Sequence, residues 1–201
     1  MGSWEIFTIV GTISFSLQGA LIAMDKEYDL FAVYLFGILT AFGGGVIRNV
    51  LIDDSDYQLW HQGSLFYIAL ISITLIMAFP KLFLASRKLW DNFLDAFGVI
   101  AFAIQGAMAA VNMDLPTSAI VVSAMITATG GGLIRDILSQ RRPILLGEVV
   151  YGLWIFLVGL IIGMGWATTN FHLYLLFGIF TTLRILSYIY KWKIPYRKYS
   201  Q

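Results

Sequence analysis

Two short stretches of this sequence place three glycines and an arginine inside long apolar segments. Each stretch reads GGG-x-x-R, and the arginines are Arg48 and Arg135. The glycines of the two triplets are Gly43, Gly44, Gly45, Gly130, Gly131 and Gly132. A glycine costs about 1 kcal/mol relative to alanine inside a helix, and an arginine at the centre of a membrane costs about 2.5–3.5 kcal/mol on insertion scales. Two structures would explain the glycines: close packing between helices, or a helix interrupted beside a water-filled path. Because the motif occurs twice with its arginine, we expect the interrupted helix.

The same segments contain few other polar side chains. Gln18 and Gln105 each precede a glycine, and Thr40 and Thr127 lie about one turn before the triplets. We expect these four residues to lie near the same path as the triplets. The glutamines could equally form hydrogen bonds between helices, and both interpretations stay open.

Charged side chains in the apolar segments are the candidates for gating. They are Arg48, Arg135, Asp95 and Asp136. An arginine in a membrane span can instead extend its side chain to the lipid headgroups, and we expect this of Arg184. Asp95 could also simply complement the dipole at a helix N-terminus.

A buried arginine needs a partner for its charge. Adjacent residues on a helix do not face each other, so Asp136 is not the expected partner of Arg135. Asp95 or Glu148 would serve instead, from another span. No acidic residue is similarly placed for Arg48, which we expect to bond to backbone carbonyls at an interrupted helix.

Composition identifies the class of protein. Of the 201 residues, 59% are hydrophobic and 12% are charged, whereas soluble domains have about 25% charged residues. The mean hydropathy is +0.79. A net charge of +1 argues against a nucleic-acid partner, which needs a basic face. Cysteine is absent, and His61 and His172 have no cluster of metal ligands nearby in the sequence. We therefore expect an integral protein of the lipid bilayer that is no enzyme and has no cofactor.

Seven apolar segments are long enough to cross a bilayer, which takes about 20 residues. They are residues 4–24, 30–52, 62–80, 92–111, 116–138, 144–166 and 169–190. Ten of the thirteen basic residues flank alternate connections and the C-terminus, while the other side carries Asp53, Asp54, Asp56 and Asp114. The positive-inside rule then predicts a multi-pass protein with its N-terminus outside and its C-terminus in the cytoplasm.

The two halves of the chain repeat each other. Gln18 recurs as Gln105 and Arg48 as Arg135, each 87 residues later, and the triplets keep the same spacing. Because each repeat has an odd number of spans, the second repeat enters the membrane from the opposite side and has an inverted topology. Inverted repeats of this kind are common in transporters, with the functional site near the membrane midplane. We expect one membrane domain over residues 1–201, composed of repeat one (about 4–84), repeat two (about 91–166), and a seventh helix with a basic tail (about 169–201).

These features resemble the trimeric intracellular cation (TRIC) channels and their prokaryotic relatives, among them bacterial proteins with a glycine-transporter domain. The resemblance rests on three plus three plus one spans and on the doubled GGG-x-x-R with its preceding Thr-Ala, and it covers essentially the whole chain. It implies a homotrimer with one pore in each subunit and with spans two and five meeting at their glycines. It also implies passive permeation of monovalent cations, chiefly potassium, and, for a chain of the prokaryotic type, a place in the cytoplasmic membrane. Animal members carry a lysine near the second motif, where this chain has Arg135.

A carrier is the alternative function. Inverted repeats with interrupted helices also suit a secondary carrier for a small zwitterion such as glycine, whose carboxylate would bind at helix N-termini. Few ionisable groups are available to couple a driving ion, so the channel is the preferred interpretation.

Overall fold

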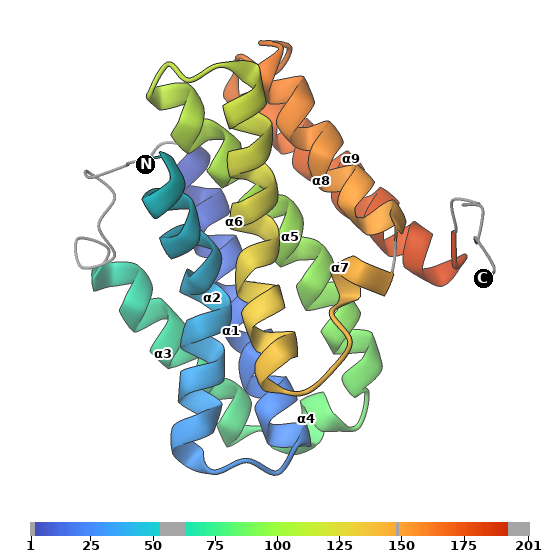
Figure 1. Ribbon diagram of the computed structural model, residues 1–201. Helices are drawn as coiled ribbons and strands as arrows, with labels where there is room; N and C mark the ends of the chain where they lie inside the picture. Colours follow the sequence, from blue (N-terminus) through green and yellow to red (C-terminus); the bar gives the residue numbers. More distant parts are fainter. Residues whose placement is uncertain (1–2, 53–62, 148, 193–201) are drawn as a thin grey trace, which may run out of the picture.

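The described part of the chain is helical throughout and contains no β-strand (Figure 1). The computed structural model describes residues 3–52, 63–147 and 149–192. Its helices are α1 (Ser3–Asp25), α2 (Leu30–Ile52), α3 (Gly63–Ala78), α4 (Pro80–Leu84), α5 (Arg87–Asn112), α6 (Thr117–Leu138), α7 (Ile144–Gly147), α8 (Val149–Gly163) and α9 (Asn170–Ile189). The all-helical class that the composition predicts is confirmed.

Five of these helices are long and apolar enough to cross a bilayer, namely α1, α2, α5, α6 and α9. Two shorter apolar helices, α3 and α8, occupy the places of the predicted third and sixth spans. Helix α3 has 16 residues, about 24 Å at 1.5 Å per residue, against a hydrocarbon core of about 30 Å. The predicted sixth span is divided between α7 and α8, and Glu148 between them lies outside the described residues. The chain is thus a multi-pass membrane protein.

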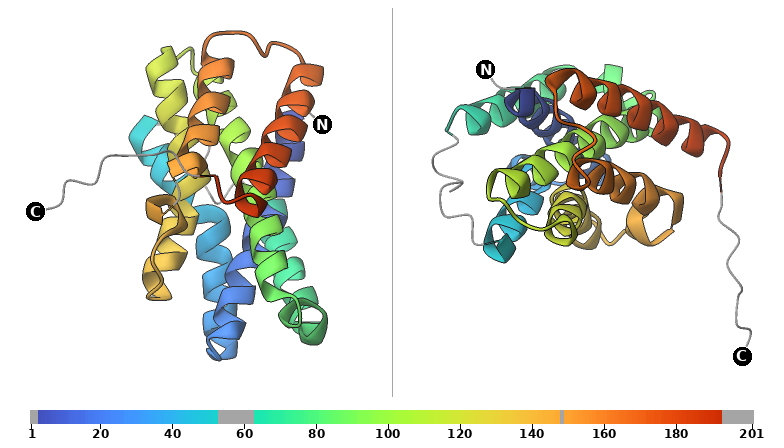
Figure 2. Two further views of the ribbon diagram at one scale, coloured as in Figure 1. Left: turned by 90° about the vertical axis from the view of Figure 1, so that its right-hand side faces the viewer. Right: turned by 90° about the horizontal axis from the view of Figure 1, so that it is seen from above.

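Four helices close a ring at the centre of the molecule. Helix α1 packs on α2, α2 on α6, α6 on α5 and α5 back on α1, whereas the diagonal pairs touch only slightly. Helix α3 covers α1 and α2, and α8 covers α6 and α5. Helix α9 lies against α5 and α8, at the edge of the bundle in the view from above (Figure 2).

Helices α1 and α5 pack by exchanging phenylalanine rings. Gly11 leaves space for the ring of Phe102 and Gly98 leaves space for that of Phe15, so a methyl group on either glycine would overlap a ring. The two rings meet edge to face with their centroids 5.1 Å apart, a favourable arrangement for aromatic pairs. Gly98 and Phe102 follow Gly11 and Phe15 by 87 residues. The contact is therefore reciprocal: a phenylalanine ring of each helix packs on a glycine of the other.

The C-terminal ends of α1 and α5 are also built alike. Each is followed by a residue in the left-handed region, Glu27 with φ 58° and Asp114 with φ 53°. The next amide donates to the carbonyl five residues before it, at 3.1 Å in both cases, as in the Schellman motif that terminates many helices. The two turns lie at opposite ends of the bundle (Figure 1).

Successive connections alternate between the two ends of the bundle. The connections α1–α2, α4–α5 and α6–α7 lie at the lower end in Figure 1, and α5–α6 and α8–α9 lie at the upper end. Lys26 lies in the α1–α2 connection, Arg87 begins α5 and Arg141 lies in the α6–α7 connection, all at the lower end. Asp114 lies in the α5–α6 connection at the upper end. Six further charged residues of the topology prediction lie outside the described residues, namely Asp53, Asp54, Asp56, Lys193, Arg197 and Lys198.

The predicted interruption of spans two and five is wrong. Helix α2 runs from Leu30 to Ile52 and α6 runs from Thr117 to Leu138, each as one α-helix that includes its glycine triplet. Close approach between the two helices, rather than a break in either, accounts for the glycines there.

Candidate functional site

Helices α2 and α6 cross at their glycine triplets. A methyl group on Gly44 would overlap the carbonyl oxygen of Thr127, and one on Gly131 would overlap the carbonyl oxygen of Thr40. The first glycine of each triplet faces the same crossing. The two backbones thus touch with no side chain between them, which only glycine permits. Close packing, the other interpretation of the motif, explains the first two glycines of each triplet.

The threonines before the triplets complete this packing. The Thr40 hydroxyl donates to the Phe36 carbonyl at 2.6 Å and the Thr127 hydroxyl to the Ser123 carbonyl at 2.7 Å, each one turn back in its own helix. Gly19 on α1 lies so close to Thr40 that a methyl group on it would overlap the threonine hydroxyl. Gly106 on α5 lies equally close to the hydroxyl of Thr127. The glycines that follow the two glutamines therefore serve helix packing.

A cavity opens above the crossing in the orientation of Figure 1. Its volume is about 30 Å³, room for roughly two water molecules. Its lining residues are Thr8, Thr12, Ala41, Phe42, Gly45, Val46, Arg48, Asn49, Phe102, Gln105 and Thr127. A methyl group on Gly45 would have no atom within 4 Å, so the third glycine of the triplet borders open space. We call this the upper cavity.

Arg48 extends across the ring at the upper cavity. The residue is 2% exposed. Its Nη1 donates to Oε1 of Gln105 at 2.7 Å and its Nε donates to Oδ1 of Asn49 at 3.0 Å. These acceptors are side-chain amides rather than the backbone carbonyls that the sequence predicts. Because Gln105 belongs to α5, Arg48 joins α2 to α5.

A smaller cavity lies below the crossing, with a volume of about 10 Å³, close to the minimum for one water molecule. Its lining residues are Thr129, Gly132, Leu133, Arg135, Asp136, Pro143, Ile144, Leu145 and Tyr151. The five of these that belong to α6 follow five of the α2 residues in the upper cavity by 87 residues each. We call this the lower cavity.

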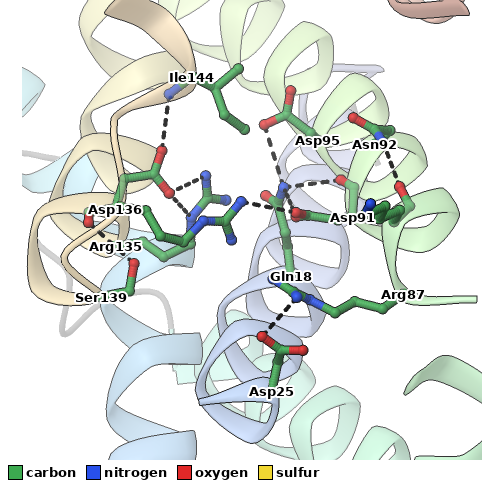
Figure 3. Close-up of polar contacts among 12 residues, drawn as sticks. Gln18, Asp25, Arg87, Asp91, Asn92, Asp95, Arg135, Asp136, Ser139 and Ile144 are labelled. Atoms are coloured by element: carbon green, nitrogen blue, oxygen red, sulfur yellow. Dashed lines mark hydrogen bonds and ion pairs between the residues drawn. The ribbon is translucent and has the colours of Figure 1, made fainter. Parts of the chain in front are cut away.

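Arg135 pairs with the residue beside it. Its Nε and its Nη2 both lie 2.9 Å from Oδ1 of Asp136, and both side chains are buried. The expectation that Asp136 is not the partner of Arg135 is therefore wrong, because an arginine is long enough to fold back over its own helix to a short neighbouring carboxylate. Of the two partners predicted from another span, Asp95 pairs with Arg184 instead, and Glu148 lies outside the described residues. Oδ2 of Asp136 accepts from the amide of Ile144 at 3.2 Å, which ties α6 to the start of α7 (Figure 3).

A second set of polar contacts joins α1, α5 and the connection after α6 (Figure 3). Nε2 of Gln18 donates to Oδ1 of Asp91 at 2.8 Å and to Oδ1 of Asp95 at 3.4 Å. Arg141 lies 3.2 Å from Oδ2 of Asp91. Gln18 thus connects helices, as one interpretation of the glutamines predicts, whereas Gln105 lines the upper cavity, as the other does.

Arg184 of α9 is buried rather than extended to the headgroups. Its Nη2 lies 3.3 Å from Oδ2 of Asp95, and each of the two side chains is 3% exposed. Its guanidinium also stacks over the ring of Tyr151, 4.6 Å from the ring centroid. The prediction that Arg184 snorkels is therefore wrong, because a carboxylate and an aromatic face inside the bundle accept its charge.

Sequence reasoning missed three residues of this region. Tyr151 is one of ten tyrosines in an apolar chain, and nothing in its surroundings marks it. Asp91 and Arg141 lie beside the ends of predicted spans, where charged residues are usual. Asp95 lines neither cavity and is placed instead between Gln18 and the last helix.

Comparison with known proteins covers nearly the whole chain. The profile of the glycine transporter family matches residues 5–81 and again residues 92–168. The UPF0126 membrane protein YvgT of Bacillus subtilis (strain 168) is 48% identical over 197 residues, with 98% of both chains covered. A structure that explains conductance through TRIC cation channels is similar with a TM-score of 0.84 and 30% identity, covering 98% of each chain. The crystal structure of a prokaryotic TRIC channel in 0.5 M KCl is similar with a TM-score of 0.86 and 28% identity, covering 95% of this chain and 98% of the other.

Proposed function

The chain belongs to the glycine transporter family and has the fold of the TRIC cation channels, and we propose that it is a passive channel for monovalent cations, chiefly potassium. The resemblance that the doubled GGG-x-x-R motif indicates is confirmed by the family match and by the fold. Proteins of this fold are described as cation channels, so the prediction that the chain is not an enzyme is confirmed as well.

The position of the two cavities carries the proposal. They lie on either side of the α2–α6 crossing, and each is lined by the third glycine and the arginine of one motif. An ion that crossed the protein would pass from one cavity to the other at the crossing, where the backbones now touch. We infer that this contact closes the path and that a shift of α2 against α6 opens it. Selectivity would then depend on the radius and the dipoles of that opening.

Arginines beside a cation path are compatible with conduction when their charge is compensated. The ion pair of Arg135 with Asp136 is neutral as a unit. The charge of Arg48 is spread over hydrogen bonds to two side-chain amides. We therefore propose that these arginines, with Asp95 and Asp136, control opening, and that the triplets, Thr40, Thr127 and Gln105 form the path.

We further propose that the molecule consists of two inverted repeats of three spans followed by a seventh, within one domain over residues 1–201. The two family matches begin 87 residues apart and also end 87 residues apart, which supports the duplication. The reciprocal contacts of Gly44 and Gly131 support an axis of pseudo-symmetry through the crossing. In this proposal α3 and α8 are the third and sixth spans.

The assembly and the orientation complete the proposal. The helices around the α2–α6 crossing close a ring within one chain, which supports one pore in each subunit, and we propose that three such subunits form a homotrimer. The connections that carry basic residues lie at the lower end of Figure 1. By the positive-inside rule this supports an N-terminus outside and a C-terminus in the cytoplasm. We propose that the protein lies in the cytoplasmic membrane of the cell.

Ion flux into liposomes tests channel against carrier. Purified protein is reconstituted, and potassium flux and the uptake of labelled glycine are measured on the same preparation, with protein-free liposomes as the control. We expect potassium flux that does not saturate and does not need glycine. Saturable glycine uptake without potassium flux would instead establish the carrier.

A further inference from the structure

Helix α9 lies beyond both family matches, the second of which ends at residue 168, yet it places a buried charge beside the lower cavity. We propose that Arg184 is a positioning residue for Arg135, so that α9 controls the opening of the lower cavity. This inference rests on the proposed channel function. It concerns the helix outside the duplication, for which the GGG-x-x-R motifs offer no function.

The first contact that carries the inference is the ion pair with Asp95. Oδ2 of Asp95 lies 3.3 Å from Arg184, and Oδ1 accepts from Gln18. Arg135 is a second positive charge that acts on Asp95, but the ion pair that Asp95 forms is with Arg184. Two arginines therefore compete for one buried carboxylate, and Arg184 holds it in this structure.

Arg135 has a donor available for that carboxylate. Its Nε and Nη2 are directed at Asp136. Its Nη1 is buried and has no hydrogen-bond partner among the described residues. A buried donor without a hydrogen-bond partner is unfavourable, so Arg135 would gain a partner if Asp95 became free.

The second contact is with the wall of the lower cavity itself. Arg184 stacks on Tyr151, and Tyr151 lines the lower cavity together with Arg135 and Asp136. A displacement of α9 would therefore release the carboxylate and the aromatic wall at the same time. Both changes favour a movement of the Arg135 guanidinium away from Asp136 and towards α5.

The position in the first repeat that corresponds to Asp95 is occupied by a neutral side chain. The residue 87 positions before Asp95 is Thr8, whose hydroxyl donates to the carbonyl of Trp4 at 2.9 Å. A neutral side chain thus stands where the lower half has the shared carboxylate. Control through α9 acts on one end of the path only.

Single-channel recording with paired variants tests the inference. Arg184→Gln frees Asp95 to attract Arg135, so we expect the ratio of open to closed time to change about fivefold or more, the lower limit for typical coupling between sites. Asp95→Asn removes the carboxylate through which Arg184 acts. In the Asp95→Asn background, Arg184→Gln should therefore leave that ratio unchanged.

Three further variants distinguish a specific effect on gating from a general loss of folded structure. Tyr151→Phe keeps the stacked ring and should change the ratio of open to closed time much less than Tyr151→Leu, which should change gating in the same direction as Arg184→Gln. Arg87→Gln breaks the 2.7 Å pair with Asp25, which is only partly buried and away from both cavities, and should leave gating unchanged. Size-exclusion chromatography checks that each variant is assembled.

The outcomes are distinct. Wild-type protein that carries no current contradicts the proposed function itself. Wild-type current with unchanged gating in assembled Arg184→Gln or Tyr151→Leu overturns the inference alone. An equal effect of Arg184→Gln with and without Asp95 also overturns it. If Arg184→Gln does not assemble, the two Tyr151 variants decide the question.

Discussion

Arg135 and Arg184 bring positive charge into the interior of the bundle, and each lies against a carboxylate there. Asp136 compensates Arg135, and Asp95 compensates Arg184. Removing one partner of a buried pair costs about 3–5 kcal/mol, because the other charge is left without compensation, whereas removing both can be nearly neutral. Mutations at these residues are therefore informative mainly in pairs.

Replacing both members of the lower-cavity pair isolates its contribution to conduction. We expect Arg135→Gln with Asp136→Asn to remain folded, because no charge is left unpaired and the new side-chain carbonyl can still accept from the amide of Ile144. Unit conductance or gating should change, since the side chain that lines the lower cavity has changed. Arg135→Gln alone should lower the thermal unfolding temperature more than the double variant does. Single-channel recording and thermal unfolding of the same preparations check both statements.

Wild-type currents from the double variant would contradict the gating function of Arg135. The matched pair Arg87→Gln with Asp25→Asn, at the same end of the bundle but away from both cavities, provides the control for removing two opposite charges.

The chemistry at these residues could be predicted only in part. The arginines and their repeat spacing are visible in the sequence, and in the structure Arg48 and Arg135 line the two cavities beside the crossing. The partners of the arginines cannot be predicted in the same way. The rule that adjacent helix residues do not face each other fails for a long side chain that folds back along its own helix, as Arg135 does towards Asp136. The partner of Arg184 lies 89 residues away, and only the packing of α9 on α5 brings the two together.

Among the helices, the decisive contact is the crossing of α2 and α6, where the glycines of one triplet differ in their surroundings. We expect Gly44→Ala to destabilise the protein by about 1–3 kcal/mol, because its methyl group would push the two backbones apart. Gly45→Ala should instead stabilise α2 by about 1 kcal/mol through helix propensity, since its methyl group meets only open space. Thermal unfolding of the two variants, followed by tryptophan fluorescence, measures the difference.

The same variants separate packing from conduction. Gly45→Ala narrows the upper cavity and should reduce potassium flux while the fold stays intact. Equal stability of the Gly44→Ala and Gly45→Ala proteins would contradict the close crossing of α2 and α6. The corresponding pair Gly131→Ala and Gly132→Ala repeats the test on α6.

The sequence identifies where these helices lie but not how near they come. The lengths of the apolar segments predict the bounds of α2 and α6 within a few residues. The two glycine triplets indicate that both helices have an unusual local structure near their middle. A triplet by itself is compatible with an interrupted helix and with a close crossing. The choice depends on the facing carbonyls of Thr40 and Thr127, which belong to the partner helix in each case.

For the molecule as a whole, the alternation of connections predicts which residues face which side of the membrane. A cysteine in place of Asp114 should react with an impermeant thiol reagent applied to intact cells, and one in place of Arg142 should react only after the cells are opened. The protein has no cysteine of its own, so labelling reports the introduced residue alone. The opposite labelling pattern would reverse the proposed orientation.

The global arrangement is the part that sequence reasoning predicts best. Helical class, membrane location and the family follow from hydropathy and from the doubled motif, because each depends on long segments rather than on single contacts. The lengths of α3 and α8 were less accessible, since apolar residues continue beyond the ends of both helices. A short α7 before α8 also leaves no mark in hydropathy.

If the two cavities belong to one cation path through each subunit, purified protein should conduct ions across a lipid bilayer. Currents through a planar lipid bilayer are measured under a gradient of potassium chloride. We expect discrete current steps whose reversal potential lies near the equilibrium potential of potassium. A reversal potential near that of chloride, or no current above that of the lipid alone, would contradict the proposed cation path.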